Sequence, residues 1–220
     1  MKFNEEIALK TAEFLLQIKA IKLNNSQPFT WASGRKSPIY CDNRVTLSYP
    51  KVRTFIRQQF VQMTNEHFGT IDLIAGVATG GIAQGVLVAQ DLGLPFAYVR
   101  SEEKKHGLSN QIEGVVQSGQ SVVVVEDLIS TGKSSLNVVN SLANAGCNIK
   151  GMIAIFTYGL KVAEESFTNA EVPLITLTDY NTLIKVAVEQ NYIKTEDLIS
   201  LNEWRENPEL WSENKIKQGF

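Results

Sequence analysis

Five short runs of mostly apolar residues, separated by stretches that can form helices, limit what this chain can fold into. The runs occupy residues 71–77, 95–100, 121–127, 149–158 and 172–178. Their apolar side chains do not alternate with polar ones, so we expect both faces of each strand to be buried. Buried strands that alternate with helices form a mainly parallel sheet with helices on both sides. The sequence therefore predicts an α/β fold with a doubly wound core.

Helical spacing of apolar residues predicts the segments around these strands. Asn4 can cap a first helix that runs to about Ala20, and a second amphipathic helix is expected over residues 49–67. Further helices are expected from about Gly81, over 133–145, near 160–168 and over 179–190. Helices in these places would supply the crossover connections that parallel strands need.

Two segments fall outside this alternation. Residues 24–48, which we call the hood, are rich in turn formers and contain short pieces typical of small strands. Residues 191–220, the C-terminal extension, are expected to form one or two short helices with Leu198, Leu201 and Trp204 turned inward. No internal repeat or low-complexity linker divides the chain, so residues 1–220 are interpreted as one domain.

Charge and composition exclude several classes of partner. The chain has 21 basic and 23 acidic residues, and the two signs are mixed, so no broad basic surface is expected for nucleic acid or anionic lipid. No apolar stretch is long enough to span a membrane, and the N-terminus lacks a signal peptide. Cys41 and Cys147 fit no metal-binding spacing and indicate reduced thiols. We therefore expect a soluble, cytoplasmic protein.

The residues with the clearest chemistry form the segment SVVVVEDLISTGKSS at 121–135, in which a buried strand ends at Glu126 and Asp127. Small residues at 130–132 then lead into a helix, whose N–H groups can bind a phosphate. Carboxylates at this edge of a parallel sheet can accept hydrogen bonds from ribose hydroxyls. A Walker A motif is excluded because it requires glycine at position 127. The alternative is an acidic strand end that merely caps the next helix.

This segment resembles the phosphoribosyl pyrophosphate (PRPP) motif of the type I phosphoribosyltransferases. The resemblance implies that Glu126 and Asp127 contact the ribose hydroxyls and that the following loop holds the 5-phosphate. The loop residues that correspond are Leu128, Ile129, Ser130, Thr131, Gly132, Lys133 and Ser134.

A polar loop at 98–114, YVRSEEKKHGLSNQIEG, is the second candidate. On its own it is either a solvated loop or a lid whose cations neutralise a leaving pyrophosphate. It resembles the catalytic loop of the orotate phosphoribosyltransferases, whose arginine, lysine and histidine correspond to Arg100, Lys104 and His106. Some members carry another lysine where this chain has Ser101.

The segment IAGVATGGIAQG at 74–85 resembles the pyrophosphate loop of the same enzymes. Glycine there lets the backbone approach an anion closely. A tyrosine–lysine pair of certain members is absent, so the resemblance implies backbone amides at Thr79 and Gly80 as the donors.

The segment FTWASGRKSPIYCDNR at 29–44 resembles the base-selecting hood of the orotate enzymes. An aromatic pair that lines their base site corresponds to Tyr40 and Cys41, so stacking is expected from Tyr40 alone. A lysine that reaches PRPP in some members is replaced by Ala32. Trp31 is interpreted as a packing residue.

The resemblance covers about residues 5–190 and implies transfer of a phosphoribosyl group from PRPP to orotate. Asp127 would orient the ribose, Ser130 would contact the orotate, and Lys104 with His106 would neutralise and protonate the leaving pyrophosphate.

It also implies Mg²⁺ bridging the PRPP oxygens, with Asp127 as a candidate protein ligand. The expected assembly is a homodimer in which each loop reaches the partner's site. Three alternatives remain: a phosphoribosyltransferase for another base, a PRPP-sensing regulator of the same fold, and a relative of PRPP synthetase.

Overall fold

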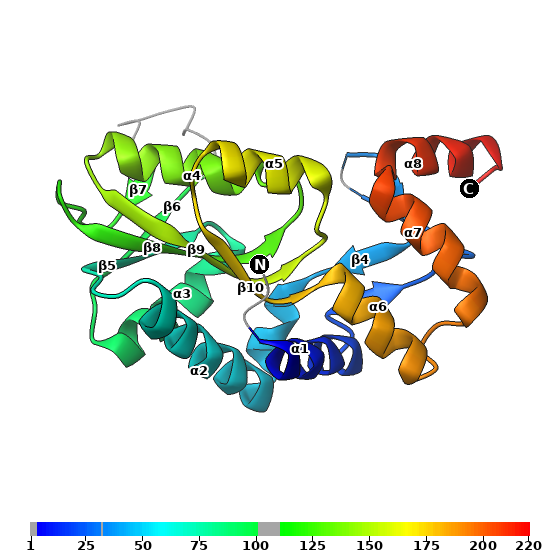
Figure 1. The fold of residues 1–220 in the computed structure, drawn as a ribbon, viewed down its shortest axis with the longest axis horizontal. Helices are drawn as coiled ribbons and strands as arrows, with labels where there is room; N and C mark the ends of the chain where they lie inside the picture. The colour runs from blue at the N-terminus through cyan, green and yellow to red at the C-terminus, as the bar shows by residue number, and fades with distance from the viewer. Residues whose placement is uncertain (1–3, 32, 101–110) are drawn as a thin grey trace.

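The central sheet of the computed structural model, which describes residues 4–31, 33–100 and 111–220, has six strands (Figure 1). Their spatial order is β10-β9-β8-β5-β6-β7, and only the β6–β7 pair is antiparallel. The strands are β5 (Leu73–Val77), β6 (Phe96–Val99), β7 (Ile112–Glu113), β8 (Ser121–Ile129), β9 (Asn148–Thr157) and β10 (Leu174–Asp179). The predicted mainly parallel sheet is confirmed.

Helices cover both faces of the sheet, as predicted (Figure 1). One face carries α4 (Lys133–Asn144) and α5 (Lys161–Asn169). The other carries α1 (Glu5–Gln17), α2 (Pro50–His67), α3 (Gly80–Leu92) and α6 (Tyr180–Glu189).

The valines of β8 show why the strand has no polar face. Val122 and Val124 belong to the apolar cluster beside α4 and α5, whereas Val123 and Val125 belong to the cluster beside α1 and α2. All four are fully buried. The uninterrupted apolar run therefore reflects two cores, one on each side of the strand.

Strand register brings the carboxyl ends of three strands, β5, β6 and β8, to one edge of the sheet. Gly76 of β5 is aligned with Val125 of β8 on one side and with Tyr98 of β6 on the other. Asp127 and Arg100 each lie two residues beyond these aligned positions. Since β5 is the single strand between β8 and β6, their backbones are about 10 Å apart.

The first helix is capped as predicted but ends earlier. The Asn4 side chain accepts hydrogen bonds from the N–H groups of Glu6 and Ile7 at 2.9 and 3.2 Å. The helix ends at Gln17, not near Ala20, because the chain must turn into a strand that the sequence analysis did not predict. That strand, β1 (Ile21–Leu23), pairs with β4 (Ile39–Cys41) of the hood.

The hood contains the small strands expected from its sequence. The hairpin of β2 (Phe29–Thr30) and β3 (Lys36–Ser37) pairs Thr30 with Lys36. A 3₁₀ helix, η1 (Asn43–Ser48), then leads into α2.

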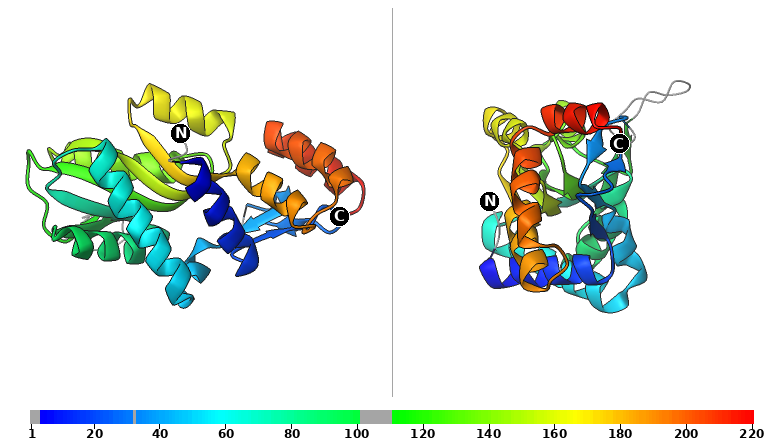
Figure 2. Two further views of the ribbon diagram at one scale, coloured as in Figure 1. Left: turned by 60° about the horizontal axis from the view of Figure 1, so that its bottom comes forward. Right: turned by 90° about the vertical axis from the view of Figure 1, so that its right-hand side faces the viewer.

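The C-terminal extension packs against the hood (Figure 2). It consists of η2 (Thr195–Asp197), α7 (Leu198–Glu206) and α8 (Pro208–Lys217). Arg35 of the hood forms an ion pair with Glu209 at 2.7 Å, and the Lys36 N–H donates to Ser212 Oγ at 2.8 Å. Trp204 is fully buried, as predicted, and contacts the ring of Trp31 edge-on at 5.9 Å between centroids. The extension thus holds the hood from outside.

In the described ranges of the chain, no helix combines the length and the apolar character needed to cross a membrane.

Candidate active site at the carboxyl edge of the sheet

Glu126 and Asp127 form an acidic pair at the carboxyl end of β8, and the two residues lie in different surroundings. Glu126 is only 5% exposed, and its two carboxyl oxygens accept hydrogen bonds from the Asp127 N–H and from Ser135 Oγ, both at 2.9 Å. Asp127 is half-buried. Asp127 is therefore the more accessible member of the pair.

The electrostatics divide the pair in the same way. Burial raises the pKa of Glu126 well above its usual value, and the charge of Asp127 raises it further. Burial also raises the pKa of Asp127, but a hydrogen bond from Glu126 opposes that increase. Glu126 therefore keeps its proton more readily, and Asp127 is the member of the pair that takes up negative charge first.

The loop after β8 provides backbone donors next to this charge. Gly132 adopts a left-handed conformation with φ of 79°, and it precedes the first residue of α4. A Cβ at Gly132 would lie 2.8 Å from the Phe167 ring, which explains the absence of a side chain. Because glycine cannot cap the helix with a side chain, the first N–H groups of α4 remain available to a phosphate.

The start of α3 lies directly against the acidic pair. A Cβ at Gly80 would overlap the Asp127 carboxylate, and a Cβ at Gly81 would overlap the carbonyl oxygen of Val125. Thr79 precedes this helix and makes no side-chain capping bond. The two glycines therefore let the predicted pyrophosphate loop reach the predicted PRPP segment.

Asn43 connects the hood to the same segment, a role that the sequence analysis missed. Its side chain is 1% exposed and donates to the Asp127 carbonyl oxygen at 2.6 Å. The backbone carbonyl of Asn43 accepts a hydrogen bond from Thr46 Oγ1. The same Thr46 oxygen accepts from Gln84 Nε2 of α3 at 3.3 Å. The sequence carried no signal for this role, because it shows neither the burial of Asn43 nor its partner 84 positions away.

A cavity of about 400 Å³ opens between the hood and β8. It is lined by Thr30, Trp31, Tyr40, Cys41, Leu128, Ser130 and Tyr158. The structure therefore brings together the three residues predicted to contact a base, Tyr40, Cys41 and Ser130.

Two aromatic rings of this cavity were not predicted as site residues. Trp31 does pack, as predicted, with its ring centroid 5.6 Å from that of Tyr158, but both rings also line the cavity. Tyr158 follows β9, so no hood pattern in the sequence could have identified it.

The Cys41 thiol is part of the cavity wall and is held in its neutral form. Burial raises its pKa well above the usual value, and the charges of Asp127 and Asp42 raise it further. The thiol donates to Asn43 Oδ1 at 3.3 Å. Cys41 and Cys147 are both free.

Arg100 lies at the base of the predicted catalytic loop. Its guanidinium pairs with Glu113 at 3.2 Å, and its N–H donates to the Gln111 carbonyl at 3.0 Å. Lys104, His106 and the replaced position Ala32 fall outside the described residues.

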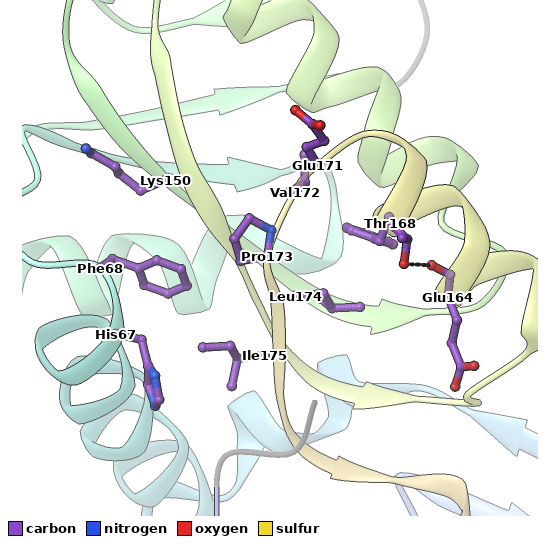
Figure 3. A pocket seen from close by; sticks show the side chains of 11 residues that line it. His67, Phe68, Lys150, Glu164, Thr168, Glu171, Val172, Pro173, Leu174 and Ile175 are labelled. Carbon is purple, nitrogen blue, oxygen red and sulfur yellow. Dashed lines mark hydrogen bonds between the residues drawn. The ribbon is translucent and has the colours of Figure 1, made fainter.

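A cavity of about 640 Å³ lies elsewhere, at the amino ends of β9 and β10 (Figure 3). Its lining includes His67, Phe68, Lys150 and Glu164, and none of the residues predicted to bind a ligand. His67 is exposed, in agreement with its position at the end of α2.

Within the described ranges, no three His, Cys, Asp or Glu side chains gather into a metal-binding group. Asp127 nevertheless supplies a partly exposed, charged oxygen donor of the kind that Mg²⁺ prefers. The residues present thus fit a metal that takes most of its ligands from a substrate.

Comparison with known proteins gives a consistent result. The Phosphoribosyl transferase domain model matches residues 49–189. Orotate phosphoribosyltransferase of Bacteroides thetaiotaomicron is 57% identical over 93% of this chain and 96% of its own length. The same-named protein of Listeria innocua is 52% identical over 93% and 98%.

Among solved structures, orotate phosphoribosyltransferase of Aeropyrum pernix has a TM-score of 0.72 at 26% identity, covering 83% of this chain and 99% of its own. The Mycobacterium tuberculosis enzyme in complex with 5-phospho-alpha-D-ribosyl 1-diphosphate has a TM-score of 0.64 at 21% identity, covering 80% and 98%. At 21% identity, the likeness to the Mycobacterium tuberculosis enzyme supports the fold alone.

One added methyl group should have different effects at the two neighbouring glycines of α3, on activity at Gly80 and on stability at Gly81. Gly80→Ala displaces the rotatable Asp127 carboxylate, so we expect kcat/KM for the substrate that binds Asp127 to fall by roughly 100-fold. Its melting temperature should stay within about 2 °C of wild type. Gly81→Ala meets backbone and should lower the free energy of unfolding by about 1–3 kcal/mol. Thermal unfolding with steady-state kinetics checks both, and equal destabilisation by the two variants would contradict this assignment.

The pKa of Glu126 predicts a pH-dependent cost in stability. At pH values between the ordinary Glu126 pKa of 4.5 and its raised pKa in the folded state, the folded protein binds more protons than the unfolded chain. The free energy of unfolding therefore falls as pH rises through this range. Glu126→Gln removes this ionisation. We expect the variant to gain stability over wild type progressively from acidic to neutral pH in calorimetry, while losing activity. A variant less stable than wild type at neutral pH would show that an ionised Glu126 stabilises the fold.

Proposed function

The chain belongs to the phosphoribosyl transferase family, where its close relatives are orotate phosphoribosyltransferases, and from this premise we propose its reaction. It transfers the phosphoribosyl group of PRPP to orotate and yields orotidine 5′-monophosphate and pyrophosphate. A bond forms between a ring nitrogen of orotate and C1 of the ribose, while the bond from C1 to the pyrophosphate oxygen breaks.

One observation carries this proposal beyond the family name. Leu128 and Ser130 belong to the segment that begins with the acidic pair, and both also line the cavity beneath the hood. A base in that cavity would therefore lie next to a ribose held at Asp127. Transfer between two bound substrates requires this adjacency.

Each element of the site has a role in this reaction. The Asp127 carboxylate accepts hydrogen bonds from the ribose hydroxyls, and the N–H groups that begin α4 hold the 5-phosphate. The N–H groups at Thr79 and Gly80 face the pyrophosphate. Lys104 and His106 neutralise and protonate that leaving group, an assignment that still rests on the sequence.

Mg²⁺ is the proposed cofactor. Bound to the PRPP oxygens, it would neutralise negative charge on the pyrophosphate, and Asp127 is the protein residue that would hold it.

We further propose a homodimer with shared active sites and a cytoplasmic location, as expected from the sequence. Arg100 and Glu113 form the base of the loop that would reach the partner. A PRPP-sensing regulator is the less favoured alternative, because a sensor does not need a base cavity beside the ribose site.

The direct test supplies the protein with Mg²⁺, PRPP and one base at a time. We expect nucleotide formation with orotate, and kcat/KM for adenine or hypoxanthine at least ~100-fold lower, because the cavity groups would be left unpaired. Product formation is followed by chromatography. Equal or better use of a purine would refute the proposed base.

Subunit mixing tests the shared site. If Lys104 acts in the partner's site and Asp127 in its own, a heterodimer of Lys104→Ala and Asp127→Asn subunits has one intact site. Random exchange should then restore about a quarter of wild-type activity from two nearly inactive proteins. Differently tagged subunits verify exchange, and no recovery after verified exchange would place Lys104 in its own subunit's site.

A further inference from the structure

The cavity beneath the hood has no charged side chain in its described lining. Its polar groups are the hydroxyls of Thr30, Tyr40, Ser130 and Tyr158 together with the Cys41 thiol. Orotate, the base of the proposed reaction, is a uracil ring that bears a carboxylate. A carboxylate that leaves water needs a compensating charge or strong donors. Among the described residues, a compensating charge would therefore have to come from a side chain just outside this lining.

Lys36 is placed to provide it. In the β2–β3 hairpin Lys36 is paired with Thr30, and its Nζ donates a hydrogen bond to Thr30 Oγ1 at 2.9 Å. Because the Thr30 hydroxyl accepts from the ammonium group, its own proton is available to an anion in the cavity. Such an anion would lie roughly 4–5 Å from the ammonium nitrogen, given ordinary hydrogen-bond lengths.

Within the described part of the chain, the positive charge of Lys36 is also uncompensated by a carboxylate. The other two cations of the hood have carboxylate partners, Arg35 with Glu209 and Arg44 with Asp42, both at 2.7 Å. No carboxylate of residues 4–31, 33–100 or 111–220 lies within ion-pair distance of Lys36 Nζ. An anionic ligand would complete this set of ion pairs.

The C-terminal extension holds Lys36 in place. The Lys36 N–H donates to Ser212 Oγ at 2.8 Å, and Ser212 is 3% exposed within α8. The next residue, Ser37, is 1% exposed and accepts from the Ile39 N–H. Both residues of β3 are thus fixed by hydrogen bonds, which preorganises the charge.

We propose that Lys36, acting directly and through Thr30, makes the site specific for a base that carries a carboxylate. This inference rests on the proposed function and identifies one determinant of its base specificity. It also gives the C-terminal extension a purpose, because α8 positions the strand that bears the lysine.

The test compares full-length wild type, Lys36→Met, Lys36→Arg and the matched control Arg35→Met, whose guanidinium already has a partner. For Lys36→Met we expect the orotate KM to rise by roughly 10- to 100-fold, as for loss of a charge-assisted hydrogen bond, with the PRPP KM changed less than about twofold. The inhibition constant of uracil, which lacks the carboxylate, should stay unchanged. Lys36→Arg should recover most of the orotate affinity. Arg35→Met loses only an exposed ion pair, which contributes little to stability, so its orotate KM should stay within about twofold of wild type.

Each other outcome is informative. An unchanged orotate KM in Lys36→Met, or a parallel rise of the orotate, uracil and PRPP constants, overturns the inference. The same rise in Arg35→Met would assign the effect to general hood charge and also overturn it. If Lys36→Met loses its native melting transition, Lys36→Gln replaces it in the same comparison. Failure of wild type to convert orotate would instead refute the proposed function.

Discussion

The close approach of α3 to the end of β8 is the constraint on which the rest of the site depends. It is possible only because Gly80 and Gly81 have no side chains where the Asp127 carboxylate and the Val125 carbonyl oxygen lie. The approach places the N-terminus of one helix beside an acidic pair whose following loop begins another helix. Two sets of backbone N–H donors therefore converge on one carboxyl edge of the sheet, where the 5-phosphate and the pyrophosphate of a substrate such as PRPP can be received.

Placing Glu126 in this acidic pair lowers the stability of the fold when its carboxyl ionises. A carboxyl that is 5% exposed beside a second acid is costly to ionise, and its hydrogen bonds to Ser135 and the Asp127 N–H only partly offset that cost. Asp127 is less buried, and a hydrogen bond from Glu126 opposes the rise of its pKa. The pair thus consists of a buried member that positions the backbone and a more accessible member that ionises more readily and is available to a ligand.

The cavity beneath the hood is assembled from parts that are distant in the sequence. Tyr40 comes from the hood, Ser130 from the loop after β8 and Tyr158 from the end of β9. The C-terminal extension, which lies beyond the matched family region, holds the hood hairpin through Ser212 and Glu209. Asn43 links the hood to the Asp127 carbonyl, so displacement of the hood would also disturb the acidic pair.

Local sequence patterns determined the α/β class, the strand ends that carry Glu126 and Asp127, and the inward Trp204, because burial and turn chemistry repeat along the chain at short range. They did not reveal β1, whose pairing depends on a strand about 20 residues away, or the partner of Asn43 across 84 positions. Tertiary structure alone decided that Trp31 and Tyr158 meet at a cavity, and that Lys36 reaches Thr30 without a carboxylate partner in the described ranges. Contacts of this kind are set by how separate elements pack, and packing geometry is not encoded in the spacing of residues within any one segment.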